Sequence, residues 1–158
     1  MRNKVALVIG VLLGGYGFWL GEGGLQLQEI LPIVGGIVGC IAVTLVSPGK
    51  LWKRAIAGVA SLALFSATYF SGLQSFDYAF TECEKRGEEV GVLLKEYYGK
   101  ENKYPTRLSQ LDGSIPCRRF TRPTLLDYER TTSGYVLSFR DWLVEHTATE
   151  SEPFMAHK

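Results

Sequence analysis

Few side chains in this sequence are suited to chemistry. The 158 residues include two histidines, His146 and His157, and neither belongs to a GxSxG, Walker or HExxH pattern. The three cysteines form no CxxC, so a zinc site or a thioredoxin-like site has little support. Asp127, Glu129 and Asp141 could pair as carboxylates, but carboxylates on hairpin edges are common. We therefore predict that the protein is not an enzyme and that it uses no metal or cofactor.

Two of the cysteines lie in the more polar half of the chain. In an oxidising compartment Cys83 and Cys117 would form a disulfide that closes a loop of about 35 residues. The chain-entropy model values such a bridge at about 4 kcal/mol, a large share of the stability of a small domain. The alternative is two separately buried thiols. Cys40 falls within an apolar run, and we predict that it is a packing residue.

One local cluster of positive charge follows the last cysteine. It comprises Arg118, Arg119, Phe120 and Arg122. Three guanidinium groups around an aromatic ring could bind a carboxylate-rich protein surface or anionic lipid headgroups. The alternative is that they pair with nearby acids such as Glu129 or Asp141 and keep the loop soluble. We predict that this cluster binds a partner.

The first half of the chain contains three apolar runs without an Asp, Glu, Lys, Arg or His residue. They cover residues 5–20, 30–46 and 55–70. Each has 16 or 17 residues, the short end of what spans a bilayer. The first run resembles the core of a signal peptide, but no small-x-small cleavage site follows it, so we favour an uncleaved helix. We predict three transmembrane helices, which lack the ionisable groups that a proton relay or an ion pathway needs.

Charge around these runs predicts their orientation. Arg2 and Lys4 precede the first run, and residues 48–54, with Lys50, Lys53 and Arg54, join the second run to the third. The connection after the first run has two acids and no base. The positive-inside rule then places the N-terminus in the cytoplasm and the C-terminal domain outside. In a bacterial inner membrane that compartment is the periplasm.

Glycines at a spacing of four residues mark candidate packing faces on the first two helices. Gly10 and Gly14 form one pair, and Gly35 and Gly39 form another. Small residues at this spacing let helix backbones approach closely in a membrane. We predict that they pack the helices of one bundle. The alternative is that one face docks another membrane protein or a second copy of the chain.

The second half is predicted to be a small α+β domain that begins with a long helix. From residue 76 onwards apolar or small residues recur in steps of four and three, as on one face of a helix. They are Phe76, Phe80, Cys83, Gly87, Val90, Leu94 and Tyr97. Gly99 is the expected helix stop.

Short strands are expected at 125–130, 135–140 and 142–146, with a hairpin at 131–134. The resulting domains are a membrane domain, 1–72, an α+β domain, 73–147, and a flexible polar tail, 148–158. The α+β domain has nearly balanced charge, which gives no support for a nucleic-acid partner.

The second half resembles the globular domain of type II secretion pseudopilins and related type IV pilins. The residues that carry the resemblance are Leu93, Leu94, Tyr97, Tyr98, Asn102, Tyr104, Pro105, Leu108, Leu111, Pro116, Tyr128, Gly134, Tyr135 and Leu137. It implies a long helix packed on a short antiparallel sheet and a surface that binds proteins. The sequence departs from the family in having three membrane helices and no prepilin cleavage motif, so polymerisation into a pilus does not carry over.

Three functions fit these observations to different degrees. The first is an inner-membrane protein whose periplasmic domain binds a partner protein, as an accessory or assembly component of an envelope or secretion apparatus. The second is an immunity protein that neutralises a membrane- or periplasm-acting toxin. The third, a small channel or transporter subunit, is disfavoured by the uncharged helices. Protein, lipid and a second copy of the chain are the expected partners.

Overall fold

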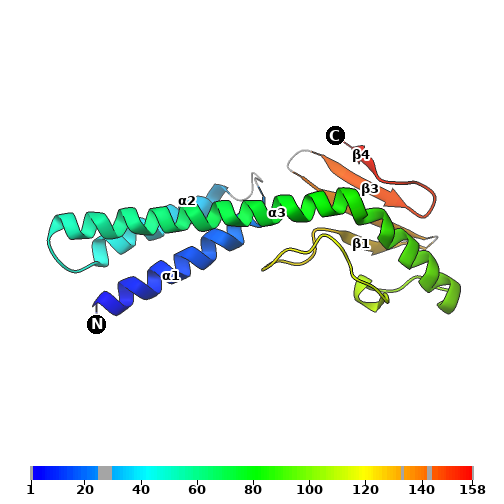
Figure 1. Ribbon diagram of the computed structural model, residues 1–158, viewed down its shortest axis with the longest axis horizontal. Coiled ribbons are helices and arrows are strands. Elements are labelled where there is room, and N and C mark those ends of the chain that lie inside the picture. Colours follow the sequence, from blue (N-terminus) through cyan, green and yellow to red (C-terminus); the bar gives the residue numbers. More distant parts are fainter. Residues whose placement is uncertain (1, 25–29, 133, 142–143, 158) are drawn as a thin grey trace. The chain divides into compact units, whose positions relative to one another are not determined.

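The computed structural model describes residues 2–24, 30–132, 134–141 and 144–157. Within these residues it contains three helices, a short 3-10 turn and one four-stranded antiparallel sheet, which makes the fold α+β (Figure 1). The chain divides into two compact units, Met1–Phe76 and Asp77–Lys158. The strands all belong to the second unit, and each unit is described by itself below.

The first unit holds α1 (Arg2–Gly21), α2 (Ile30–Val46) and the beginning of α3 (Leu51–Glu101). Among the described helices only α3 is long and apolar enough to cross a membrane. The apolar parts of α1 and α2, Val5–Gly21 and Ile30–Val46, are shorter. The three helices share a core of Leu13, Leu20, Cys40, Val43 and Phe65.

Close contact in this unit occurs at several glycines. A Cβ atom at Gly21 on α1 would collide with the carbonyl oxygen of Tyr69 on α3 and would lie 2.8 Å from the Cα atom of Gly72. A Cβ atom at Gly39 on α2 would lie 2.7 Å from the Leu13 side chain. The backbones of α1 and α3 can approach this closely only because Gly21 and Gly72 both lack a side chain.

The four glycines predicted to pack the helices differ in their surroundings. A Cβ at Gly39 would meet Leu13 tightly, and one at Gly14 would lie at an ordinary 3.5 Å from Leu64. A Cβ at Gly35 would only reach the Tyr16 hydroxyl at 4.0 Å, and one at Gly10 would have no neighbour within 4 Å. The tight α1–α3 crossing lies instead at Gly17 and Gly21. These glycines follow Gly14 by one and two helical turns on the same face of α1.

The long helix predicted at the start of the second half is the continuation of α3, which runs without a break to Glu101. Gly99 does not end the helix. Asn102 does, because it adopts a left-handed conformation (φ 57°) and its N–H still donates to the carbonyl of Tyr98 at 2.8 Å. The predicted stripe is confirmed, since Cys83, Gly87, Val90 and Leu94 are all buried.

The sheet in the second unit follows the order of the chain. Its strands are β1 (Asp127–Arg130), β2 (Tyr135–Arg140), β3 (Glu145–Thr149) and β4 (Met155–His157). Tyr135, Leu137 and Phe139 of β2 are buried, as the alternating pattern predicts. Phe139 meets Phe80 of α3 edge to face, with ring centres 5.5 Å apart, so the helix stripe packs on β2. A short turn, η2 (Leu108–Gln110), lies between α3 and the sheet in the chain.

The predicted flexible tail is wrong, because residues 145–157 supply the last two strands. β3 pairs with β2 so that Leu137 lies opposite Ala148 and Phe139 opposite His146. Ala148 is buried, and the His146 ring stacks on Phe139 with centres 4.6 Å apart. The sequence of this segment looks polar because the two residues of β3 that face the core are a histidine and an alanine. Trp142 and Leu143, which we expected at the start of a strand, lie outside the described residues.

Candidate protein-binding loop and its anchor

The predicted disulfide between Cys83 and Cys117 is present. It joins α3 to the segment before the sheet, with the Cα atoms 5.0 Å apart and the two cysteines separated by 34 positions in the chain. Both cysteines are fully buried. The bridge therefore fixes the start of the arginine-containing loop to the long helix.

Hydrogen bonds hold Cys117 on both sides of its backbone. Its N–H donates to Oε2 of Glu82 at 2.8 Å, and its carbonyl oxygen accepts from the N–H of Leu125 at 2.8 Å. Cys117 has a positive φ of 68°, a conformation that non-glycine residues rarely adopt without support. Here the disulfide and the two hydrogen bonds supply that support.

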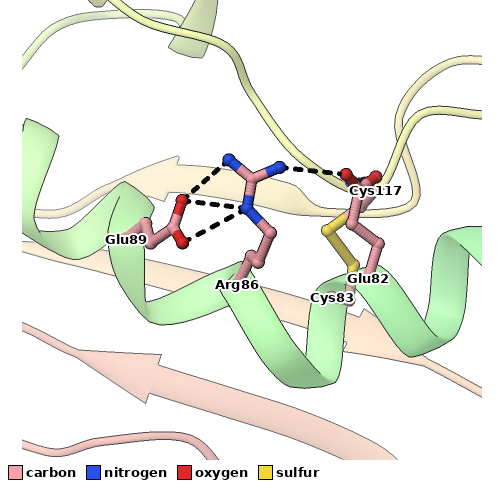
Figure 2. A network of polar contacts seen from close by, with 5 residues as sticks. All are labelled: Glu82, Cys83, Arg86, Glu89 and Cys117. Atoms are coloured by element: carbon pink, nitrogen blue, oxygen red, sulfur yellow. Dashed lines mark hydrogen bonds and ion pairs between the residues drawn. A yellow bond between two sulfur atoms is a disulfide. The ribbon is translucent and has the colours of Figure 1, made fainter.

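An exposed network of charges positions the Glu82 carboxylate. Figure 2 shows Arg86 between Glu82 and Glu89, with Nη1 3.3 Å from Oε1 of Glu82 and Nη2 2.9 Å from Oε2 of Glu89. The hydrogen bond to Glu89 raises the pKa of Arg86, and the same bond lowers the pKa of Glu89. Because Arg86 and Glu89 are exposed, these two ion pairs contribute little to stability. Their effect is to orient Glu82 towards Cys117.

The bond between Cys117 and Leu125 closes the base of a loop, residues 118–124, which we call the Phe120 loop. Arg119 braces it from within, since its Nε donates to the carbonyl of Pro123 at 2.7 Å and its Nη2 to that of Thr124 at 3.5 Å. Phe120 is 85% exposed, the largest exposed fraction of any large hydrophobic side chain described. An aromatic ring is thus presented to solvent by a loop that is closed and crosslinked at its base.

The four predicted partner-binding residues therefore have different surroundings. Arg119 is half-buried and braces the loop, whereas Phe120 and Arg118 are exposed and Arg122 is half-buried. Sequence reasoning grouped them by charge. It had no signal for the brace, because that depends on which carbonyl groups the closed loop turns inwards.

Tyrosines form a second cluster, between the end of α3 and the sheet. The Tyr104 ring lies 4.8 Å from that of Tyr98 and 5.2 Å from that of Tyr135, and the Tyr128 hydroxyl donates to the carbonyl of Pro105 at 2.7 Å. Burial raises the pKa of Tyr104, Tyr128 and Tyr135, and a hydrogen bond to Glu150 also raises that of Tyr104. Tyr104 and Tyr135 are buried, Tyr128 is half-buried and Tyr98 is exposed, so the cluster is mostly core.

The side chains considered for catalysis or metal binding do not come together in the described part of the chain. The His146 ring packs against the rings of Phe80 and Phe139. His157 is exposed on β4. Asp141 accepts a hydrogen bond from the N–H of Val144 at 2.8 Å. Among the described residues, no three histidine, cysteine or carboxylate side chains are placed to hold a metal ion.

Glu22, which sequence reasoning passed over as a loop residue, is fully buried in the first unit. The Ser75 hydroxyl donates to its Oε1 at 2.6 Å. A buried carboxylate needs such partners, and the close crossing of α1 and α3 at Gly21 and Gly72 brings this one into reach.

Comparison with known proteins adds no family to these observations, since the chain matches no protein-family model, no curated protein and no solved structure.

Proposed function

We propose that this chain is a non-enzymatic, multi-pass inner-membrane protein whose exported domain binds another protein through the Phe120 loop. We further propose that it acts as an accessory or assembly component of an envelope or secretion apparatus. The long helix packed on an antiparallel sheet is compatible with the pilin-like resemblance of the second unit, which would supply a scaffold for such binding.

The outer surface of the first unit supports its placement in a membrane. Large apolar side chains that are exposed there occur on all three helices. Examples are Leu7, Val11, Leu31, Leu45, Val59 and Phe70, each more than half exposed. Soluble monomers rarely expose continuous apolar surface of this extent. Lipid would cover it, and we propose that α1, α2 and the apolar part of α3 each cross the bilayer.

The charge pattern and the disulfide support an exported second unit. Lys50 lies between α2 and α3, and Lys53 and Arg54 lie in the first turn of α3, where the positive-inside rule expects the cytoplasmic side. Three crossings then put residues 77–158 on the other side. A bridge between Cys83 and Cys117 fits an oxidising compartment such as the periplasm.

The single observation that carries the binding proposal is the exposure of Phe120 on a loop that a disulfide holds at its base. Aromatic and arginine side chains are enriched among the residues that contribute most to protein interfaces. A loop already held by a disulfide and by Arg119 loses little conformational entropy when it binds. Arg118, which is exposed two positions before Phe120, would favour a partner that carries carboxylates.

Affinity capture from native membranes tests this proposal. The full chain with a C-terminal tag, the Phe120→Ser variant and the Tyr78→Ser variant are each crosslinked, solubilised and analysed by mass spectrometry. Tyr78 is the matched control because it is 70% exposed in the same unit. We expect a stoichiometric partner with the wild type and with Tyr78→Ser, and at least a tenfold loss with Phe120→Ser. Equal recovery with all three proteins would refute the role of the loop.

The identity of the captured protein separates the two binding functions. A component of a secretion or envelope apparatus would support the assembly function. A toxin encoded beside this chain would instead indicate an immunity protein that uses the same loop.

A further inference from the structure

An open groove lies among the three helices of the first unit. Its volume is about 420 Å³, and its walls include Gly10 of α1, Ser47 after α2, and Ala57, Ala60 and Ser61 of α3. The groove exists because these side chains are small. A Cβ atom at Gly10 would have no neighbour within 4 Å, so the surrounding helices do not fill this space themselves.

The walls of the groove are apolar despite the two serines. The Ser47 hydroxyl donates to the carbonyl of Val43 at 2.7 Å, and the Ser61 hydroxyl donates to that of Ala57 at 2.9 Å. Each hydroxyl group is thus satisfied by a backbone carbonyl group four positions earlier in the chain. A hydrocarbon chain in the groove would therefore leave neither serine hydroxyl group without a hydrogen-bond partner.

Three basic residues lie near one end of the groove in the chain, although none of them lines it, and the Lys53 amine lies over the Trp52 ring, 5.6 Å from its centre. On α3 the lining residues Ala57, Ser61 and Leu64 share one face, and the same face one turn earlier carries Lys53 and Arg54. Pro48 also lines the groove, and Lys50 follows it by two positions. The Arg54 Nε donates to the carbonyl of Gly49 at 3.1 Å, which fixes its stem beside this turn.

We propose that the groove binds an anionic phospholipid, whose acyl chain lies along Gly10 and Ala60 while its phosphate group faces Lys50, Lys53 and Arg54. The inference rests on the proposed membrane placement of the first unit. Charge complementarity selects the occupant, because a transmembrane helix would fill the apolar groove but would leave the basic end without an anion. Basic side chains at the end of an apolar groove between helices are the chemistry that recognises anionic headgroups.

Native mass spectrometry of the detergent-solubilised full chain tests the proposal with two lipids of identical acyl chains. The probes are dioleoylphosphatidylglycerol, which is anionic, and dioleoylphosphatidylcholine, which is zwitterionic. We expect the anionic lipid to bind the wild type at least tenfold more tightly. In Lys53→Gln this preference should fall about fivefold, since one base near a headgroup contributes roughly that factor. Lys85→Gln, an exposed lysine in the second unit, is the charge control and should leave the preference unchanged.

A second variant tests the groove itself. Ala60→Leu adds a side chain at an exposed position that lines the groove, and Ala63→Leu adds the same side chain at an exposed position of α3 outside it. We expect Ala60→Leu to weaken binding of both lipids at least fivefold and Ala63→Leu to leave it unchanged. Equal affinity for the two lipids, or equal effects of the two leucines, would overturn the proposal.

Two further readouts identify the cause of a negative result. If carbonate extraction releases the wild-type chain from membranes, the proposed membrane placement itself fails. If the chain stays in the membrane and Ala60→Leu abolishes crosslinking between copies without changing lipid binding, the groove takes a second copy of the chain, and the lipid proposal is overturned.

Discussion

At the scale of single residues, Cys117 contributes both to the stability of the second unit and to the position of the loop that exposes Phe120. Its side chain is bonded to Cys83 on α3, its N–H to Glu82 and its carbonyl oxygen to Leu125. The same residue begins the loop that carries Phe120. A change that frees Cys117 should therefore lower stability and loosen the loop together.

Removal of the disulfide is the first test at this scale. Cys83→Ser or Cys117→Ser should destabilise the full chain by about 4 kcal/mol, because a crosslink over 34 positions restricts the unfolded chain. Thermal melting in detergent, with and without reductant, measures the effect. Reductant should lower the melting temperature of the wild type and leave the serine variants unchanged. Identical melting of the wild type with and without reductant would contradict the account.

Glu82 offers a second test, since its carboxylate accepts the N–H of Cys117. Glu82→Ala removes the acceptor and should cost about 1–3 kcal/mol, the usual cost of leaving a partly buried donor unpaired. Glu82→Gln keeps an oxygen acceptor and should cost less. Glu84→Ala, an exposed neighbour, is the control. Chemical denaturation compares the four proteins, and equal losses for alanine and glutamine at position 82 would argue against the hydrogen bond.

At the scale of elements, the crossing of α1 and α3 depends on glycine. In Gly21→Ala the new methyl group would collide with the carbonyl oxygen of Tyr69 and crowd Gly72. Such overpacking costs about 1–3 kcal/mol, more than the roughly 1 kcal/mol that alanine gains over glycine in a helix. Gly15→Ala is the matched control, because no atom lies within 4 Å of its Cβ position. Melting in detergent should fall for Gly21→Ala alone, and equal melting of the two variants would place the crossing elsewhere.

The tyrosine cluster between α3 and the sheet predicts a loss of stability in alkali. Burial raises the pKa of Tyr104, Tyr128 and Tyr135, whereas in the unfolded chain a tyrosine ionises near about pH 10. The unfolded chain therefore releases these protons first. The stabilisation is fully present below about pH 10 and is lost as pH rises from there towards the raised values.

Thermal melting as a function of pH measures this loss. The melting temperature of the wild type should fall above about pH 10, and the fall should be shallower in Tyr104→Phe, which cannot ionise at that position. Tyr78→Phe, at an exposed position, should follow the wild type. Identical slopes for all three proteins would show that Tyr104 does not report on folding.

Elements with a strong period could be predicted from the sequence, and weakly patterned ones could not. Cys83, Val90 and Leu94 recur at helical spacing, and Tyr135, Leu137 and Phe139 alternate, so α3 and β2 follow from the residues. β3 was predicted only over its first two residues, because His146 and Ala148 do not mark an inward face, and β4 was not predicted. The Phe120 loop was identified by charge, but its closure at Leu125 is a tertiary contact that no local pattern encodes.

At the scale of the whole molecule, the two compact units differ in surface character. Large exposed apolar side chains are concentrated in Met1–Phe76, whereas Asp77–Lys158 exposes few, among them Tyr78, Val92 and Phe120. We infer that the two units have different surroundings, with lipid around the first unit and water around the second. The 85% exposure of Phe120, three positions after the crosslinked Cys117, is the feature of the second unit on which the proposed binding rests.

Site-specific photo-crosslinking in living cells tests this central claim most directly. A photoreactive phenylalanine analogue is placed at position 120 of the full chain, and a second protein carries it at position 78 as the control. The account predicts one discrete crosslinked protein that appears on illumination only with the analogue at position 120. The absence of any protein adduct at position 120, or the same adduct from both positions, would contradict the account.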